Sequence, residues 1–213
     1  MITRRAVTAA LSLTGLAAFS SRLLIPGAMA QSASDVAKPV SLPDMALGPA
    51  DAKVTIVEYA AATCPHCARF NAAVFPKIKS EYIDTGKVRY VFRDFPLNIK
   101  DVACSMLART IAKDDAAKYF AIVDTFFRQQ EQLVDKTTET LSRVGKQAGL
   151  SQQAVEACLK DQAMLDKLTA DRKFAMDVLK VEGTPTFFVN GEAIVGETPF
   201  EEFDRKIKSL LKS

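Results

Sequence analysis

The spacing of apolar positions in the first half of the chain predicts a strand, a helix and a second strand. The run VTIVEYA (54–60) is rich in β-branched and aromatic residues and is short enough for a buried strand. Between residues 67 and 86 apolar side chains recur close to helical spacing, Gly86 ends this helix, and Pro76 should kink it. The run KVRYVFRDF (87–95) is the second strand, and the β-α-β order implies a right-handed crossover with parallel pairing.

The second half of the chain predicts a helical block, a hairpin and a final helix. The pattern is helical throughout residues 98–181. The segment 184–196 is predicted to form two strands joined at Asn190-Gly191, a dipeptide that favours a tight hairpin turn, and a helix follows at 199–211. This order is typical of the α/β thioredoxin fold with a helical insert between its β-α-β and β-β-α halves.

Residues 1–30 have the pattern of a secretory signal peptide. A pair of arginines precedes a small apolar run (6–19), and the small-x-small motif AMA (28–30) predicts cleavage before Gln31. A transmembrane anchor is the alternative, but the apolar run stops well short of the roughly 20 residues that a membrane span needs. We therefore expect a cleaved signal, and the paired arginines leave the Sec and twin-arginine export routes both open.

The net charge of the chain falls from positive to zero once this signal is removed. The whole chain has 28 Lys and Arg against 25 Asp and Glu. Cleavage takes away three arginines and no acid, so the remainder is balanced and gives no electrostatic argument for nucleic acid or anionic lipid as a partner. Residues 31–45 are small, polar and Pro-containing and are predicted to be a flexible lead-in to one domain at 46–213.

The cysteines and the single histidine point to redox chemistry. Cys64 and Cys67 lie three positions apart in TCPHC, with His66 between them, and an exported chain can form disulfides. The other two cysteines, Cys104 and Cys158, have no CxxC partner of their own, so a zinc site would lack ligands at normal spacing. We expect neither a metal nor a cofactor.

The tetrad CPHC is predicted to begin the first helix. Proline is favoured at the first helical position, so Pro65 places Cys64 at the N-cap, where backbone N–H groups and the helix dipole stabilise a thiolate. Cys67, one turn further, should be more shielded and have a higher pKa. Because a stabilised thiolate favours the reduced pair, the disulfide would act as an oxidant. An inert structural disulfide and a metal site are the alternatives.

His66 is predicted to tune this redox centre. Its ring would lie over the same helix end and, when protonated, would add a positive charge beside the Cys64 thiolate. The alternative is a solvent-exposed histidine at a helix start, with no role in the chemistry.

With these motifs the sequence resembles the DsbA family of periplasmic thiol-disulfide oxidoreductases, on EYAAATCPHC, the helical block and GTPTFFVNG. The resemblance implies that Cys64 is the nucleophile that forms a mixed disulfide with substrate and that Cys67 is the resolving thiol. Thr184-Pro185 matches the family's cis-proline loop, which binds the substrate peptide. The alternative for Pro185 is an ordinary trans proline at the start of a strand.

The resemblance also gives Glu58 a role. The family keeps a buried acid at this position beneath the disulfide, where a carboxyl can relay the proton of Cys67. An exposed acid at a strand edge is the alternative. A cationic partner for Glu58 is expected from the next strand, either Arg89 or Arg93.

Cys104 and Cys158 lie on predicted helices of the insert. Resemblance to disulfide-stapled members of the family implies a structural bond between them, and buried free thiols are the alternative.

The resulting expectation is a monomeric periplasmic oxidase. It would donate the Cys64–Cys67 disulfide to newly exported, folding proteins and be reoxidised by a DsbB-like membrane partner. Three alternatives stay open: a disulfide reductase or isomerase, a CxxC module that carries a soft metal such as Cu(I), and a chaperone that binds unfolded chains.

Overall fold

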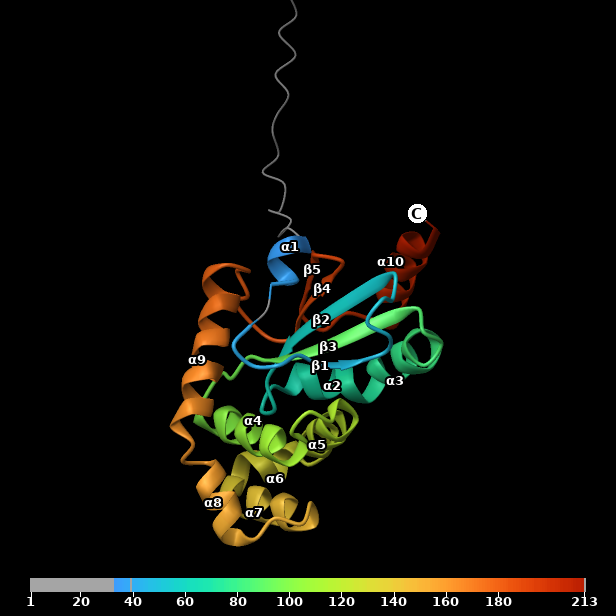
Figure 1. The fold of residues 1–213 in the computed structure, drawn as a ribbon. Coiled ribbons are helices and arrows are strands. Elements are labelled where there is room, and N and C mark those ends of the chain that lie inside the picture. Colours follow the sequence, from blue (N-terminus) through green and yellow to red (C-terminus); the bar gives the residue numbers. More distant parts are fainter. Residues whose placement is uncertain (1–32, 39, 213) are drawn as a thin grey trace, which may run out of the picture.

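The fold is built on a five-stranded mixed sheet with the strand order β1-β3-β2-β4-β5 (Figure 1). The structure is a computed structural model that describes residues 33–38 and 40–212, so the predicted signal at 1–30 lies outside the described residues. Strands β2 and β3 pair in parallel, and the remaining neighbours pair antiparallel. The strands are β1 (Met45–Leu47), β2 (Val54–Ala60), β3 (Val88–Asp94), β4 (Thr186–Val189) and β5 (Glu192–Val195).

The predicted β-α-β unit and hairpin are both confirmed. The hairpin turn between β4 and β5 places Asn190 at φ 46° and Gly191 at φ 88°. A tight turn of this kind needs positive φ at both central positions, which asparagine and glycine tolerate best. Asn190 also accepts the Thr55 N–H at 2.7 Å, which ties the turn to the start of β2.

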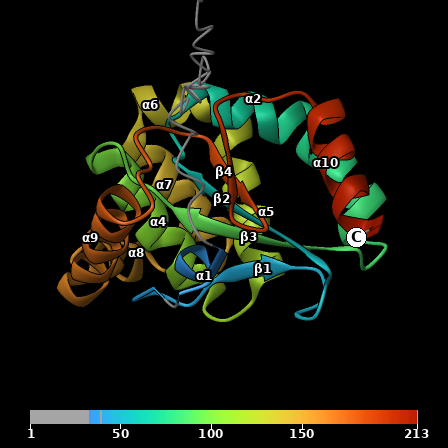
Figure 2. The same ribbon diagram turned by 90° about the horizontal axis from the view of Figure 1, so that it is seen from above.

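Helices cover both faces of the sheet. Alternate side chains of β2 point to opposite faces, so Ile56 packs with the helix that follows Cys64 and with the last helix, while Val57 packs against Ala175 and Leu179 on the other face. The last helix, α10 (Phe200–Lys212), and the long helix α9 (Gln162–Asp177) accordingly lie on opposite sides of the sheet in both views (Figures 1 and 2).

The helix predicted across residues 67–86 is interrupted. It breaks at Val74, because Pro76 lacks a backbone N–H and its ring crowds the carbonyl four residues earlier. The pieces are α2 (Pro65–Ala73), α3 (Phe75–Ile78) and a π-helix (Lys79–Ile83).

The helical insert joins β3 to β4 and shares a core with the sheet, through Ala60 and Phe92. Leu107, Tyr119, Phe126 and Leu133 are almost fully buried in a cluster that also contains the two cysteines of the CPHC tetrad. The α/β class and the thioredoxin fold with a helical insert are therefore confirmed, and none of the helices within 33–38 and 40–212 is long and apolar enough to cross a membrane. Besides α9, the insert contains α4 (Ile99–Ala112), α5 (Ala116–Arg128), α6 (Gln130–Asp135), α7 (Thr137–Gln147) and α8 (Gln152–Cys158).

The described part of the predicted flexible lead-in is instead packed against the domain. It contains a short helix, α1 (Ala33–Val36), and continues into β1, whose first residue Met45 is buried. The Arg93 guanidinium binds the Val36 carbonyl at 3.0 Å and the Asp44 carboxylate at 2.8 Å. Contacts with a distant strand hold the described part of this segment, and its own composition does not reveal them.

Candidate active site

Cys64 caps the helix that carries the tetrad. Its backbone is extended, and its sulfur accepts the Cys67 N–H at 3.3 Å, with Pro65 in the first turn of α2. This is the N-cap arrangement that the sequence predicts. The cap brings the sulfur to the end of α2 where backbone N–H groups are unpaired and the helix dipole is positive.

The surroundings of Cys64 favour its thiolate and lower its pKa to about 6. A hydrogen bond from the Cys67 thiol is the largest cause, burial of Cys64 opposes it, and Thr184 and the N–H groups of Cys67 and His66 lower the pKa further. When protonated, the Cys64 thiol donates to the Thr184 carbonyl at 3.3 Å. A thiol with this pKa is mostly ionised at neutral pH and is reactive as a nucleophile or a leaving group.

Cys67 behaves in the opposite way. Its side chain is fully buried, and burial, the hydrogen bond to the Cys64 sulfur and the charge of Glu58 all raise its pKa. The two cysteines of one tetrad therefore differ strongly in proton affinity, and of the two only Cys64 favours the thiolate at neutral pH.

Glu58 lies in the sheet beneath the tetrad and is buried. Burial raises its pKa to about 8, partly offset by a hydrogen bond from the Tyr90 hydroxyl at 2.7 Å, while the charge of Cys64 raises it further. Its carboxyl is therefore mainly protonated at neutral pH. Because Glu58 and Cys67 influence each other's charge, the carboxyl can hold or release a proton as the state of Cys67 changes.

The expected cationic partner of Glu58 is absent, and its partner on β3 is Tyr90. In the parallel register Glu58 is aligned with Phe92, so Tyr90 shares its face, whereas Arg89 and Arg93 point to the opposite face. Arg93 instead contacts Asp44. Burial lowers the Arg93 pKa, but the ion pair with Asp44 and the hydrogen bond to the Tyr59 hydroxyl outweigh burial and raise it. The prediction failed because the register of the two strands places Arg89 and Arg93 on the face of β3 that Glu58 does not share.

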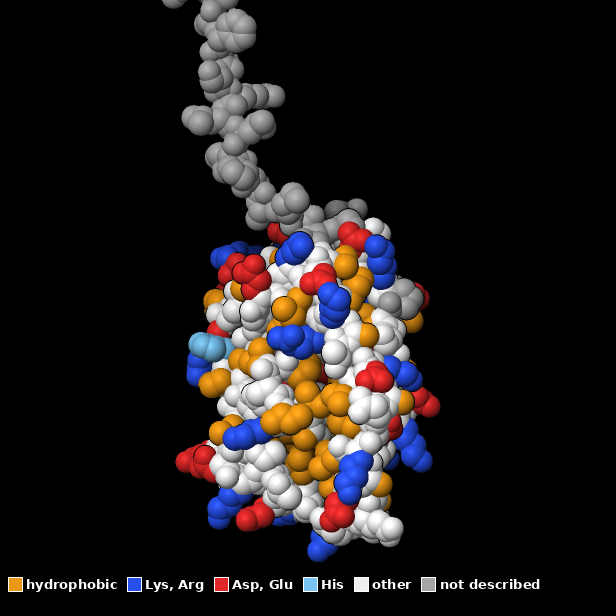
Figure 3. Space-filling view, turned by 90° about the vertical axis from the view of Figure 1, so that its left-hand side faces the viewer, with side chains coloured by type: hydrophobic (Ala, Val, Ile, Leu, Met, Phe, Trp, Pro, Cys, Tyr) orange, Lys and Arg blue, Asp and Glu red, His pale blue; other side chains and the backbone are white. Residues whose placement is uncertain are grey.

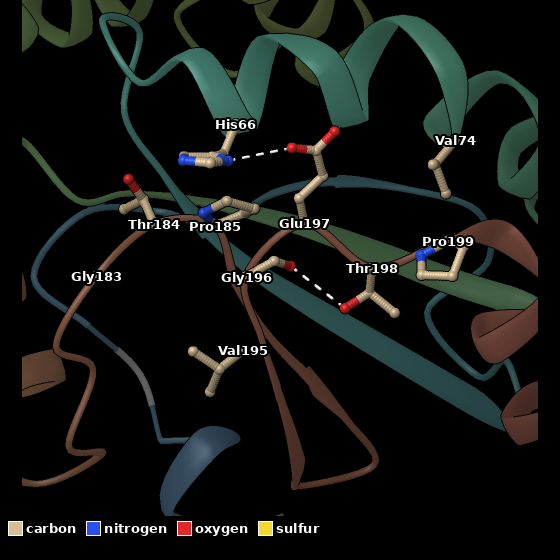
Figure 4. A pocket seen from close by; sticks show the side chains of 10 residues that line it. All are labelled: His66, Val74, Gly183, Thr184, Pro185, Val195, Gly196, Glu197, Thr198 and Pro199. Carbon is tan, nitrogen blue, oxygen red and sulfur yellow. Dashed lines mark hydrogen bonds and ion pairs between the residues drawn. The ribbon is translucent and has the colours of Figure 1, made fainter.

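The loop before β4 lies beside the Cys64 sulfur. The Thr184–Pro185 peptide bond is cis, as the family resemblance implied. The Thr184 carbonyl faces Cys64, and the Thr184 hydroxyl is buried with no hydrogen-bond partner within the described part of the chain. A groove of about 630 Å³ opens next to this loop between α2 and the segment that follows β5 (Figure 4). Its lining includes His66, Thr184, Pro185, Val195, Glu197 and Pro199.

His66 lies at the mouth of this groove and has two charged neighbours that the sequence did not single out. Its Nδ1 lies 3.1 Å from Glu197 Oε2 and 2.7 Å from Arg69 Nη2. Arg69 follows His66 by three positions, a helical spacing that places the two side chains on one face and could have been recognised. Glu197 comes from the loop after β5, and no sequence signal connects it to the tetrad.

A second set of polar contacts holds the residue before Cys64. Asp101, buried in the first turn of α4, accepts the Thr63 N–H at 2.7 Å and the Thr63 hydroxyl at 3.0 Å. The same carboxylate accepts the Leu97 N–H at 3.0 Å, and the Asn98 amide donates to the Thr63 hydroxyl at 2.9 Å. The N-terminus of α4 is thereby fixed to the loop that carries Cys64.

The insert contacts this loop at one further point. The Gln130 amide, at the start of α6, donates to the carbonyls of Ala62 at 2.8 Å and Cys64 at 3.0 Å. Two separate helices of the insert therefore position the backbone on either side of Thr63. The sequence did not reveal these contacts, because they join residues far apart in the chain.

Replacing Asp101 with alanine should destabilise the protein by about 2–3 kcal/mol, because the N–H groups of Thr63 and Leu97 lose their acceptor. Urea unfolding followed by circular dichroism measures the loss. Asp101→Asn keeps one acceptor oxygen and should lose about half as much. An Asp101→Ala variant within 0.5 kcal/mol of the parent would contradict this role.

Cys104 and Cys158 lie in the insert, on two helices that pack together, α4 and α8. Both are buried free thiols in this structure, as are the two cysteines of the tetrad. Burial raises the pKa of each, and the Cys158 thiol donates to the Val155 carbonyl at 3.1 Å. The bond between them stays a prediction. No group of three or more His, Cys, Asp or Glu suited to hold a metal ion occurs among residues 33–38 and 40–212.

Comparison with known proteins agrees with this fold and site. Residues 41–209 match the family model described as Thioredoxin. A Rickettsia bellii protein provisionally named protein-disulfide oxidoreductase is 38% identical over 150 residues, which cover 70% of this chain and 57% of that protein. The chain therefore spans little more than half of the length of that relative.

Other relatives match over most of their length. A Bacillus anthracis protein provisionally named disulfide bond formation protein D is 32% identical over 172 residues, 78% of this chain and 77% of that protein. The crystal structure of Wolbachia pipientis alpha-DsbA1 superposes with a TM-score of 0.74 at 32% identity, covering 84% of this chain and 96% of that one. The chain is a thioredoxin-fold protein with a CxxC site, and it belongs to the DsbA-like branch of the thioredoxin family.

Proposed function

We propose that this chain catalyses thiol–disulfide exchange and donates the Cys64–Cys67 disulfide to substrate proteins. The observation that carries the proposal is the asymmetry of the pair, a Cys64 thiol with a pKa of about 6 against a buried Cys67 with a raised pKa. The cis-proline loop beside Cys64 supports it further, since it offers a carbonyl next to the sulfur.

The exchange proceeds in two steps. A substrate thiolate attacks the Cys64 sulfur, the Cys64–Cys67 bond breaks, and Cys67 leaves as a thiolate that takes up a proton. A second substrate thiolate then attacks the substrate sulfur of the mixed disulfide and expels Cys64 as its stable thiolate. The substrate loses two electrons as its disulfide forms, and the cysteine pair of this protein gains them.

Apolar surface around the site supports folding proteins as substrates. Besides the groove in Figure 4, a second groove lies between α9 and the loop before α4, on a face where apolar side chains gather (Figure 3). Leu97 in this groove is 46% exposed and the neighbouring Ile99 is 75% exposed. Unfolded segments expose apolar side chains that such a surface can bind.

The cellular setting is part of the proposal. Exported proteins as substrates, a periplasmic location, a monomeric state and reoxidation by a DsbB-like membrane protein follow from the family resemblance and from the predicted signal at residues 1–30. Oxidation suits that compartment, because disulfides persist there.

The redox equilibrium with glutathione tests the direction of the reaction. At pH 7 a pKa of about 6 stabilises the reduced pair by about 1.4 kcal/mol, or about 30 mV toward an oxidant. We expect a potential above the roughly −270 mV of thioredoxin, by a few tens of millivolts from this cause. A value close to thioredoxin would favour a reductase instead. Quenching with acid and separating the thiol and disulfide forms by mass gives the equilibrium constant.

A further inference from the structure

Glu197, Arg69 and His66 form a charged cluster at the mouth of the groove beside the redox site. Arg69 Nε donates to both carboxylate oxygens of Glu197, at 3.1 and 2.9 Å, and its Nη2 lies 2.8 Å from Oε2. The side chains of His66, Arg69 and Glu197 are 58%, 54% and 37% exposed. Ion pairs this exposed contribute about 0–1 kcal/mol to stability, so a stabilising role does not account for the cluster.

The loop that carries Glu197 is fixed to the cis-proline loop. The Gly196 N–H donates to the Pro185 carbonyl at 2.8 Å, and the buried Thr198 donates its hydroxyl to the Gly196 carbonyl at 3.3 Å. The carboxylate therefore has a defined position relative to the end of α2. Figure 4 shows Glu197 and His66 pointing toward one another across the groove, with Pro185 beside them.

The Nδ1 atom of His66 lies between a group that can only donate and a group that can only accept. If Nδ1 carries no proton, it can accept from Arg69 but cannot bond to the Glu197 carboxylate. If Nδ1 is protonated, it can donate to Glu197 in the neutral ring as well as in the positive ring, so these hydrogen bonds do not fix the charge of the ring. The charges of the neighbours act on it in opposite directions, because the Glu197 carboxylate favours the positive ring and the Arg69 guanidinium opposes it.

We propose that Glu197 is a positioning residue that makes the positive form of His66 available beside the Cys64 thiolate and so tunes the redox equilibrium. The inference rests on the proposed exchange at Cys64 and deepens it. The charged groups in contact with the ring are Arg69 on α2 and Glu197 from the loop after β5, and Cys64 caps the same helix two residues before His66. Without the Glu197 charge, Arg69 alone would oppose protonation of the ring.

The first test follows the ring directly. His66 is the only histidine of the chain, so in untagged protein one pair of imidazole signals in a proton–carbon NMR spectrum reports its charge unambiguously. In Glu197→Gln the ring should take up its proton only at a lower pH than in the parent. Glu201→Gln, which removes an exposed acid on the first turn of α10, is the matched control and should titrate like the parent.

The second test is a double-variant cycle in the glutathione equilibrium at pH 6 and pH 9. At pH 6, His66→Gln should lower the equilibrium constant for reduction of the Cys64–Cys67 disulfide by up to about twofold in the parent and by less in the Glu197→Gln background. At pH 9, where a histidine is neutral, the two substitutions should act independently.

The outcomes separate this inference from the proposed function. Independent effects at pH 6, an unshifted ring titration, or an equal coupling at pH 9 would each overturn the role of Glu197 while the exchange at Cys64 stands. A parent protein whose Cys64–Cys67 disulfide does not exchange with glutathione at all would overturn the proposed function as well.

Discussion

Cys64→Ser should reduce the oxidation of a peptide dithiol to its uncatalysed rate. The expected loss is complete because a hydroxyl cannot form the Cys64–Cys67 disulfide that the substrate thiolate attacks. Measuring disulfide formation in the peptide by reversed-phase chromatography, with glutathione disulfide as the final oxidant, gives the rate.

A companion variant identifies which sulfur faces the substrate. Cys67→Ser should still attack a mixed-disulfide or disulfide substrate through Cys64, but it cannot resolve the adduct, which should accumulate and be visible by intact mass.

The thiols in the insert serve as controls. Cys104→Ala and Cys158→Ala should leave the rate within about twofold of the parent, because neither side chain belongs to the tetrad. Adducts on Cys67 in Cys64→Ser, with none in Cys67→Ser, would reverse the assignment.

Much of the fold could be predicted because its signals are local. The strand that precedes the tetrad, the proline that starts α2 and the Asn190-Gly191 turn each depend on a few consecutive residues. The N-cap role of Cys64 belongs to the same class, since it needs only Pro65 next to it. The position of the redox centre at a strand-to-helix junction could therefore be predicted from the sequence.

The missed features depend on contacts between distant segments. Strand β1 has only three residues, too few to show a period, and it forms because Met45 pairs with Phe92 of β3. Glu197 reaches His66 across 131 positions, and Asp101 reaches Thr63 across 38. No residue pattern within either segment predicts that these side chains lie in contact.

One error came from the register of two strands, which the sequence does not show. Arg89 and Arg93 lie on the same face of β3, because alternate residues of a strand point to opposite faces. With β2 and β3 parallel, Glu58 is aligned with Phe92, so Tyr90 was the polar candidate on its face. The partner is therefore a neutral hydroxyl, which leaves the carboxyl free to be protonated near neutral pH.

Glu58→Gln should slow the first exchange step about 10²-fold at pH 7, the lower end of what a positioned general acid contributes. In that step Cys67 leaves as a buried thiolate with a raised pKa, and a protonated Glu58 can supply its proton. Glutamine keeps the shape and can still accept from Tyr90, but it has no proton to give.

The pH dependence distinguishes this role from a loss of packing. Glu58 has its pKa raised to about 8, so the acid form is present below that pH and is lost above it. The rate of mixed-disulfide formation, normalised to the substrate thiolate concentration and followed by stopped flow, should fall in the parent as pH rises through about 8. Glu58→Gln should show no such fall. Tyr90→Phe removes the hydrogen bond that lowers the Glu58 pKa, so its break should move to higher pH. Equal rates, with the same break near pH 8, in Glu58→Gln would mean that the proton reaches Cys67 from solvent. The buried Glu58 would then contribute to the packing of the sheet and not to the exchange.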